Sequence, residues 1–99
     1  MIHVQRHPEF DKFIAGIKDQ TTQGRIAARL ARLMNGNPGD SESVGDGVIE
    51  MRIDFGPGWR IYYTKVGNQI VVLLGGGTKK QQQADIDAAK QRAKLYKQD

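Results

Sequence analysis

The strongest constraint on the fold is an alternation of apolar and polar residues on both sides of Gly56-Pro57-Gly58. Apolar residues occupy Ile49, Met51, Ile53 and Phe55 before this segment, and Trp59, Ile61 and Tyr63 after it. A period of two is typical of a strand with one buried face, and Gly-Pro-Gly favours a turn. We therefore predict a β-hairpin that buries these apolar side chains. The intervening residues are expected to face solvent, and they include Glu50, Arg52, Arg60 and Tyr62.

Two amphipathic helices are predicted before the hairpin. Apolar residues recur at i, i+3, i+4 and i+7 from Phe10 to Ile17, and a helical spacing returns from Ile26 to Met34. Pro8 suits the first turn of the first helix. Thr21 or Thr22 is a candidate N-cap for the second helix. Together the two segments predict a helical hairpin.

Two more strands are predicted outside the hairpin. The alternation in Ile2 to Gln5 predicts a short opening strand, and the continuous apolar run Ile70 to Leu74 predicts a strand covered on both faces. Between the helices and the hairpin, Asn37 to Gly47 is rich in Gly, Ser, Asn and Asp, so we expect a loop there.

The end of the chain predicts a third helix. Gly75-Gly76-Gly77 is expected to end the last strand, and Thr78 with Gln81 matches a capping box that would open a helix. Its thin apolar stripe consists of Ile86, Ala89, Ala93 and Tyr96. The predicted fold is therefore α+β, in the order strand, helix, helix, strand, strand, strand, helix, with a helical hairpin and a C-terminal helix on a mostly antiparallel four-stranded sheet.

Composition excludes several classes of protein. The 99 residues suffice for one domain, and the longest apolar run is far below the roughly 20 residues that cross a bilayer. The first residues lack a signal-peptide pattern, so we expect a cytoplasmic protein with no membrane partner. The chain has no cysteine, and His3 and His7 are its only histidines. We therefore predict neither a metal nor another cofactor.

Charge is distributed unevenly along the chain. The formal net charge is +4, with the excess of bases at both ends and more acids than bases between residues 37 and 78. Antiparallel pairing would bring Arg52 and Arg60 onto one sheet face, near Lys79 and Lys80, and such a cluster suggests a phosphate site. The alternative is that Glu50 and Asp54 neutralise Arg52. A second group, on one side of the predicted second helix, is either a docking surface or a solvated face; its members are Arg25, Arg29 and Arg32.

Four segments carry a resemblance to a known protein family. They run from Asn35 to Asp40, from Val44 to Asp54, from Gly56 to Tyr63 and from Leu73 to Gln81, followed by Asp85-Ile86 and Ala89. These segments resemble the RelE/ParE superfamily of bacterial type II toxins, in particular its HigB-like branch of addiction-module killer proteins. The resemblance covers nearly the whole chain and implies the same order of elements.

The resemblance also implies a function and partners. Members of this superfamily inhibit growth and are neutralised by a cognate antitoxin. A helix-turn-helix, HigA-like antitoxin is expected here, and it would carry the complex to operator DNA. RelE-like and HigB-like members cleave mRNA on the ribosome, whereas ParE-like members inhibit DNA gyrase. We expect ribosome-dependent mRNA cleavage, with gyrase inhibition or a decayed active site as the alternatives.

Site residues follow from the same resemblance. Arg60 lies where the family has its phosphate-binding arginine, Arg52 lies in the Glu-x-Arg strand motif, and Lys80 lies near a basic residue after the last strand. These three are expected to be catalytic. Contacts with RNA are expected from Lys79, Tyr62 and Trp59, and contacts with the antitoxin from Arg25, Arg29 and Arg32.

Two features of this chain depart from the family pattern. The segment Gln81 to Ile86 lacks the tyrosine or histidine that can transfer protons in relatives, and the paired lysines of one RelE branch are missing from the first hairpin strand. A general acid or base contributes about 10²- to 10⁴-fold to such reactions. Asp85, Lys79 and Glu50 are candidate substitutes, and the sequence does not choose among them.

Overall fold

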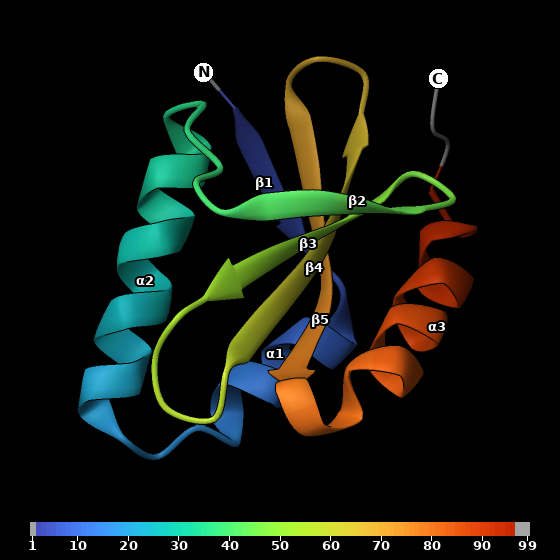
Figure 1. Cartoon of the computed structure of the whole chain (residues 1–99). Coiled ribbons are helices and arrows are strands. Elements are labelled where there is room, and N and C mark those ends of the chain that lie inside the picture. Colours follow the sequence, from blue (N-terminus) through green and yellow to red (C-terminus); the bar gives the residue numbers. More distant parts are fainter. Residues whose placement is uncertain (1, 97–99) are drawn as a thin grey trace.

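The computed structural model describes residues 2–96, which form one five-stranded sheet with helices on both of its faces (Figure 1). In chain order the elements are β1 (His3–Arg6), α1 (Pro8–Ala15), α2 (Gln20–Met34), β2 (Ser41–Gly45), β3 (Val48–Ile53), β4 (Trp59–Val66), β5 (Ile70–Thr78), the 3₁₀ turn η1 (Lys79–Gln81) and α3 (Gln82–Ala93). The predicted α+β class is confirmed. None of the described helices is long and apolar enough to cross a membrane.

The sheet has the strand order β1-β5-β4-β3-β2, and its pairs are antiparallel except for β1 with β5. The predicted four-stranded sheet is wrong by one strand, because β2 lies within the predicted loop Asn37 to Gly47. This strand is at the sheet edge and its residues are partly or fully exposed. An edge strand of Ser and Glu has no apolar alternation to reveal it, since it is held by backbone pairing with β3 rather than by burial.

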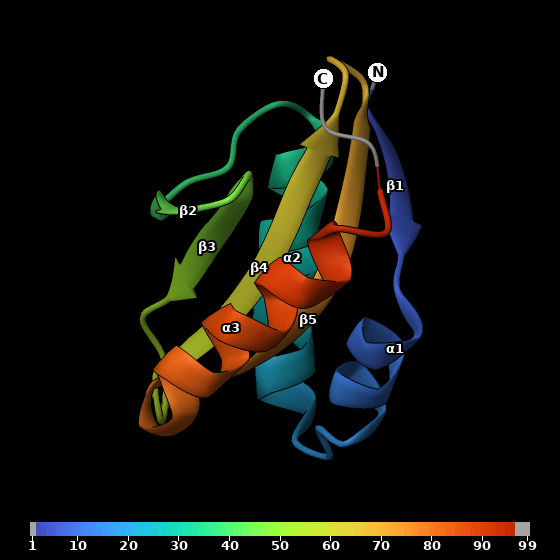
Figure 2. The same cartoon turned by 90° about the vertical axis from the view of Figure 1, so that its right-hand side faces the viewer.

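The helices α1 and α2 cover one face of the sheet, as predicted (Figure 2). The apolar alternation of the hairpin points to this side. Buried residues of this core are Phe10, Ile17, Ile26, Leu33, Met51, Ile53, Ile61, Tyr63, Val71 and Leu73. The predicted N-cap of α2 is wrong: Asp19 caps it, accepting hydrogen bonds from the backbone N–H of Thr22 at 2.9 Å and from its hydroxyl at 2.7 Å.

The opposite face of the sheet is covered by α3 (Figure 2), which corrects the prediction of a solvent-facing side for the hairpin. Val48, Tyr62, Val72 and Leu74 pack there against the apolar stripe of α3. Glu50 and Tyr62 are each only 1% exposed. These polar positions of β3 and β4 are therefore buried, because α3, which is distant in sequence, covers them. They form a buried polar cluster beside a second apolar core.

The triple glycine continues β5 rather than ending it. A Cβ at Gly76 would overlap the ring of Phe13 on α1, and a Cβ at Gly77 would overlap the carboxylate of Asp85 on α3. The missing side chains thus let both helices approach the sheet closely. The predicted capping box is also wrong, since within the described residues Thr78 makes no side-chain capping bond and η1 precedes α3.

Candidate functional site

A groove of about 450 Å³ lies beside the turn between β3 and β4. It is lined by Asp40, Arg52, Asp54, Gly56, Pro57, Gly58, Arg60 and Lys79. Arg52 and Arg60 are direct cross-strand partners, which confirms the predicted pairing. The next pair along the sheet, Trp59 with Thr78, places η1 and its lysine next to the start of β4. Three of the predicted cations therefore meet at one groove.

Arg52 is held by carboxylates at the edge of the groove. Its guanidinium donates to Asp40 at 3.0 and 3.2 Å and to Glu42 at 2.8 Å, and it lies 3.7 Å from Glu50. Hydrogen bonds with Asp40 and Glu42 raise the pKa of Arg52, and the bond from Arg52 lowers the pKa of Asp40. The predicted neutralisation of Arg52 is therefore found, but Asp40 and Glu42 supply its hydrogen bonds instead of Glu50 and Asp54. Neither residue was a candidate, because their segment was predicted to be a loop.

Arg60 is mostly buried, whereas the hairpin pattern predicted an exposed side chain. Its side chain is 11% exposed, because α3 and η1 cover this face. Its Nη1 donates to the carbonyl of Gly58 at 3.3 Å. Its Nε lies 3.9 Å from a carboxylate oxygen of Glu50, and it is buried without a hydrogen-bond partner among the described residues. The guanidinium thus lines the groove from a fixed, largely desolvated position.

Beneath the groove, Glu50 accepts two hydrogen bonds on one carboxylate oxygen. The Tyr62 hydroxyl donates at 3.1 Å, and Nε2 of Gln82, from the first turn of α3, donates at 2.8 Å. Burial raises the pKa of Tyr62, and the charge of Glu50 raises it further, so this phenol stays protonated. Tyr62, predicted to contact RNA, lies under the groove instead of on its surface. No sequence pattern pointed to Gln82.

The remaining predicted site residues lie apart from the groove wall. Trp59 packs toward the other face of the sheet, with its ring 5.9 Å from that of Phe13. Lys80 is exposed in η1 beside Lys79, but it is not part of the groove lining. Asp85 lines a different pocket of about 280 Å³ between α1 and α3, and burial raises its pKa. Of the three candidate substitutes for a missing acid or base, Lys79 lines the groove.

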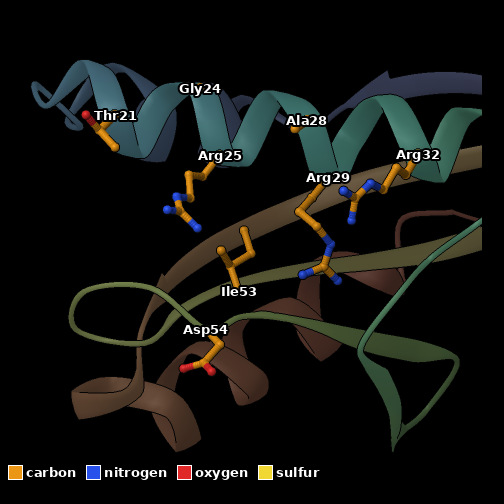
Figure 3. Close-up of a pocket in the computed structure, with 8 residues that line it drawn as sticks. All are labelled: Thr21, Gly24, Arg25, Ala28, Arg29, Arg32, Ile53 and Asp54. Carbon is orange, nitrogen blue, oxygen red and sulfur yellow. The ribbon is translucent and has the colours of Figure 1, made fainter.

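The arginines of α2 line a second pocket of about 400 Å³ (Figure 3). All three side chains project from α2 toward the end of β3. Arg25 lies over the ring of Phe55 at 4.4 Å, and Arg32 is exposed. Arg29 donates to the backbone carbonyls of Arg52 at 2.5 Å, Pro38 at 3.1 Å and Asp40 at 3.3 Å. Burial lowers the pKa of Arg29. This residue is therefore part of the fold, whereas Arg25 and Arg32 present their charge to solvent.

The structure also bears on metal binding. Within residues 2–96, no group of three or more His, Asp or Glu side chains is arranged to hold a metal ion.

Comparisons with known proteins give a family and one relative. A family model described as "Phage derived protein Gp49-like (DUF891)" matches residues 10–94. An "Uncharacterized protein" of Haemophilus influenzae (strain ATCC 51907 / DSM 11121 / KW20 / Rd) is 40% identical to this chain over 89 residues, which is 90% of each protein. No solved structure matches the chain.

Proposed function

This chain belongs to the Gp49-like family, a part of the RelE/ParE-like toxin superfamily, and from this membership we propose that it cleaves mRNA on the ribosome as the toxin of a type II toxin–antitoxin pair. The family implies a cognate antitoxin as partner. A HigB-like branch, a helix-turn-helix antitoxin and operator binding through that antitoxin are further parts of the proposal. They rest on the resemblance in the sequence.

The observation that carries the proposal is the position of Arg60 in the groove, with Lys79 beside it. In RNA cleavage of this kind the 2′-OH gives up its proton to water and attacks the adjacent phosphorus, the bond to the 5′-oxygen breaks, and a 2′,3′-cyclic phosphate forms. Negative charge accumulates on the phosphoryl oxygens as the attack proceeds. A guanidinium that is already fixed and largely desolvated stabilises that charge without reorganising. Arg60 meets both conditions.

The other cations take lesser roles in this proposal. Arg52 can reach a phosphate only by exchanging its bonds to Asp40 and Glu42, so we assign it to binding once RNA has entered. Lys79 lines the groove and is assigned to protonation of the leaving 5′-oxygen, in place of the tyrosine or histidine that can transfer protons in relatives. Lys80, on the exposed side of η1, contributes to the attraction of the RNA backbone.

Arg60→Ala tests the proposal, with Lys65→Ala as the matched control because Lys65 is an exposed cation at the other end of β4. Growth after induction, new mRNA 5′ ends and plasmid supercoiling are compared at matched expression. We expect wild type and Lys65→Ala to arrest growth and to cut within translated frames, and Arg60→Ala to do neither. Since Arg60 is mostly buried, circular dichroism and urea unfolding must show that the Arg60→Ala variant folds. Lys79→Ala repeats the test at a groove residue that is exposed, where the substitution does not disturb the core.

Three results would contradict the proposal. Unchanged mRNA with altered supercoiling would identify a gyrase inhibitor instead. Growth arrest by Arg60→Ala at the wild-type level would remove the assigned phosphate contact. Absence of any effect of wild type on growth, mRNA and supercoiling would favour a toxin with a decayed active site.

The pocket on α2 is proposed as a contact surface for the antitoxin. Arg25 and Arg32 are exposed, and the small residues Gly24 and Ala28, which line the same pocket, leave room for an approaching segment. An acidic segment fits this charge. Arg29 was expected to share in this contact, but its two terminal nitrogens already bind backbone carbonyls and its Nε is buried, so the proposal keeps the other two arginines only.

A further inference from the structure

We propose that Glu50 is the positioning residue of this site, a buried carboxylate that fixes the guanidinium of Arg60 for phosphate. The inference rests on the proposed function, because it assigns Glu50 a role toward the residue that would bind the phosphate. It also makes statements about Arg60 that hold whatever the target of the toxin is.

The first argument is the like charge of two neighbouring residues. Arg52 and Arg60 stand directly opposite each other on β3 and β4, and like charges in such a pair destabilise a sheet. The two carboxylate oxygens of Glu50 lie one toward each arginine, at 3.7 Å from Nη1 of Arg52 and at 3.9 Å from Nε of Arg60. Asp40 and Glu42 already neutralise much of the charge of Arg52, and the carboxylate of Glu50 between the two arginines offsets the repulsion that remains.

The second argument is that Glu50 is held independently of the arginines. Tyr62 on β4 and Gln82 on α3 both donate to the oxygen that faces Arg60. With its side chain 2% exposed, Glu50 cannot reorient toward solvent. Its position is thus set by three elements of the fold, and Arg60 is the partner that it orients.

The third argument concerns the buried Nε of Arg60. This N–H has no hydrogen-bond partner in the described part of the chain, so the attraction of Glu50 is what compensates its loss of water. With Nε turned toward Glu50 and one N–H of Nη1 bound to the carbonyl of Gly58, the other terminal N–H groups of the guanidinium are available to the groove. A phosphate then meets a cation whose orientation has already been fixed, which lowers the entropic cost of binding.

Glu50→Gln tests this role because it keeps the side-chain volume and an acceptor for Tyr62 and Gln82 while it removes the charge. The readouts are hydrogen exchange of the Arg60 Nε–H by NMR and the affinity for inorganic phosphate from the shift of the same signal. We expect exchange to accelerate and phosphate affinity to fall, each by about tenfold or more. Glu50→Asp, which retains the charge, is expected to recover part of the affinity.

Thr64→Val is the control for a purely structural effect. Thr64 is buried on β4, the strand of Arg60, and its hydroxyl donates to the carbonyl of Gly47 at 2.8 Å, away from the groove. We expect this variant to lower stability but to leave the Arg60 signal and phosphate affinity at wild-type values. If Glu50→Gln does the same, Glu50 is only structural and the inference is overturned.

A second variant covers the case in which Glu50→Gln does not fold. Gln82→Ala removes one of the two hydrogen bonds that hold Glu50, from a half-exposed position in the first turn of α3. It is expected to accelerate exchange of the Arg60 Nε–H by about threefold, and unchanged exchange would overturn the inference. Neither readout needs RNA or a ribosome, so a failure of the proposed cleavage activity leaves this test intact.

Discussion

The two groups of arginines differ in what the fold does with them. In the groove, Arg52 is bound by the carboxylates of Asp40 and Glu42, and Arg60 is buried over Glu50. On α2, Arg29 binds backbone carbonyls, while its two neighbours remain exposed. Each group thus contains arginines whose side chains are already bound by other groups of the fold. Spacing in the sequence shows which arginines share a face, but it does not show which of them keep a free charge.

The largest difference is expected between Arg29 and its neighbours on α2. Arg29→Ala removes a charged donor from three carbonyls that join α2 to the Pro38–Asp40 segment and to β3. Loss of these bonds should lower the free energy of unfolding by about 2 to 3 kcal/mol. The matched variant Arg32→Ala, on the same helix but exposed, should change it by less than about 0.5 kcal/mol. Urea unfolding of both variants measures the difference.

Equal unfolding midpoints for the two variants would contradict this comparison, and Arg29 would then belong with the exposed cations. A second outcome sharpens it. If Arg29→Ala is destabilised and Arg29→Lys is equally destabilised, the planar guanidinium is required, because a single ammonium cannot reach three separate carbonyls with the same geometry.

Much of the fold could be predicted because the first core has a clear period. The apolar stripes of α1 and α2 and the alternation in β3 and β4 point to the same core. The second core could not be predicted from the hairpin, since α3 covers it only after the chain has returned from β5. Its contribution is visible in the predicted run Ile70 to Leu74, in which Val71 to Leu74 are buried on both faces and Ile70 is partly buried.

The candidate site was predicted less completely than the fold. Strand parity correctly paired Arg52 with Arg60, and the position of Lys79 directly after the last strand correctly placed it near them. Strand parity did not predict that Arg60 is mostly buried, because parity alone does not reveal that α3 lies over this face. It also missed Asp40 and Gln82, which reach the site from a loop and from a helix end, where no periodicity constrains the position of a side chain.

An effect of intermediate size is expected for association with the cognate antitoxin that the family implies. Arg25→Glu with Arg32→Glu should slow association by about tenfold and reduce its dependence on salt, because exposed charges act mainly on the association rate. The control pair Lys65→Glu with Lys94→Glu makes the same change in net charge at exposed positions outside α2. Association rates are measured from low salt to about 0.5 M, where screening is strong.

Equal slowing by both pairs would mean that only the net charge matters, and α2 would then be a solvated face. An unchanged rate for the pair on α2 would exclude this helix from the contact altogether. A slower rate for that pair alone would identify the exposed arginines of α2 as a contact surface, unlike Arg52, whose charge is paired with Asp40 and Glu42.

The smallest expected effect is a dependence on pH, which distinguishes the carboxylate partner of Arg52 from the backbone carbonyl partners of Arg29. Bonds from Arg52 lower the pKa of Asp40 below its ordinary value of 3.8, so the pair stabilises the fold fully above that value and loses this contribution as the pH falls through the lowered pKa. The carbonyl partners of Arg29 do not titrate in this range. An NMR titration should therefore find Asp40 below 3.8 in wild type and closer to 3.8 in Arg52→Ala. Asp19, whose pKa is lowered by hydrogen bonds from Thr22, should titrate alike in both proteins and serves as the internal control. If Asp40 titrates identically in the two proteins, Arg52 is not held by it in solution, and its charge is free for the groove.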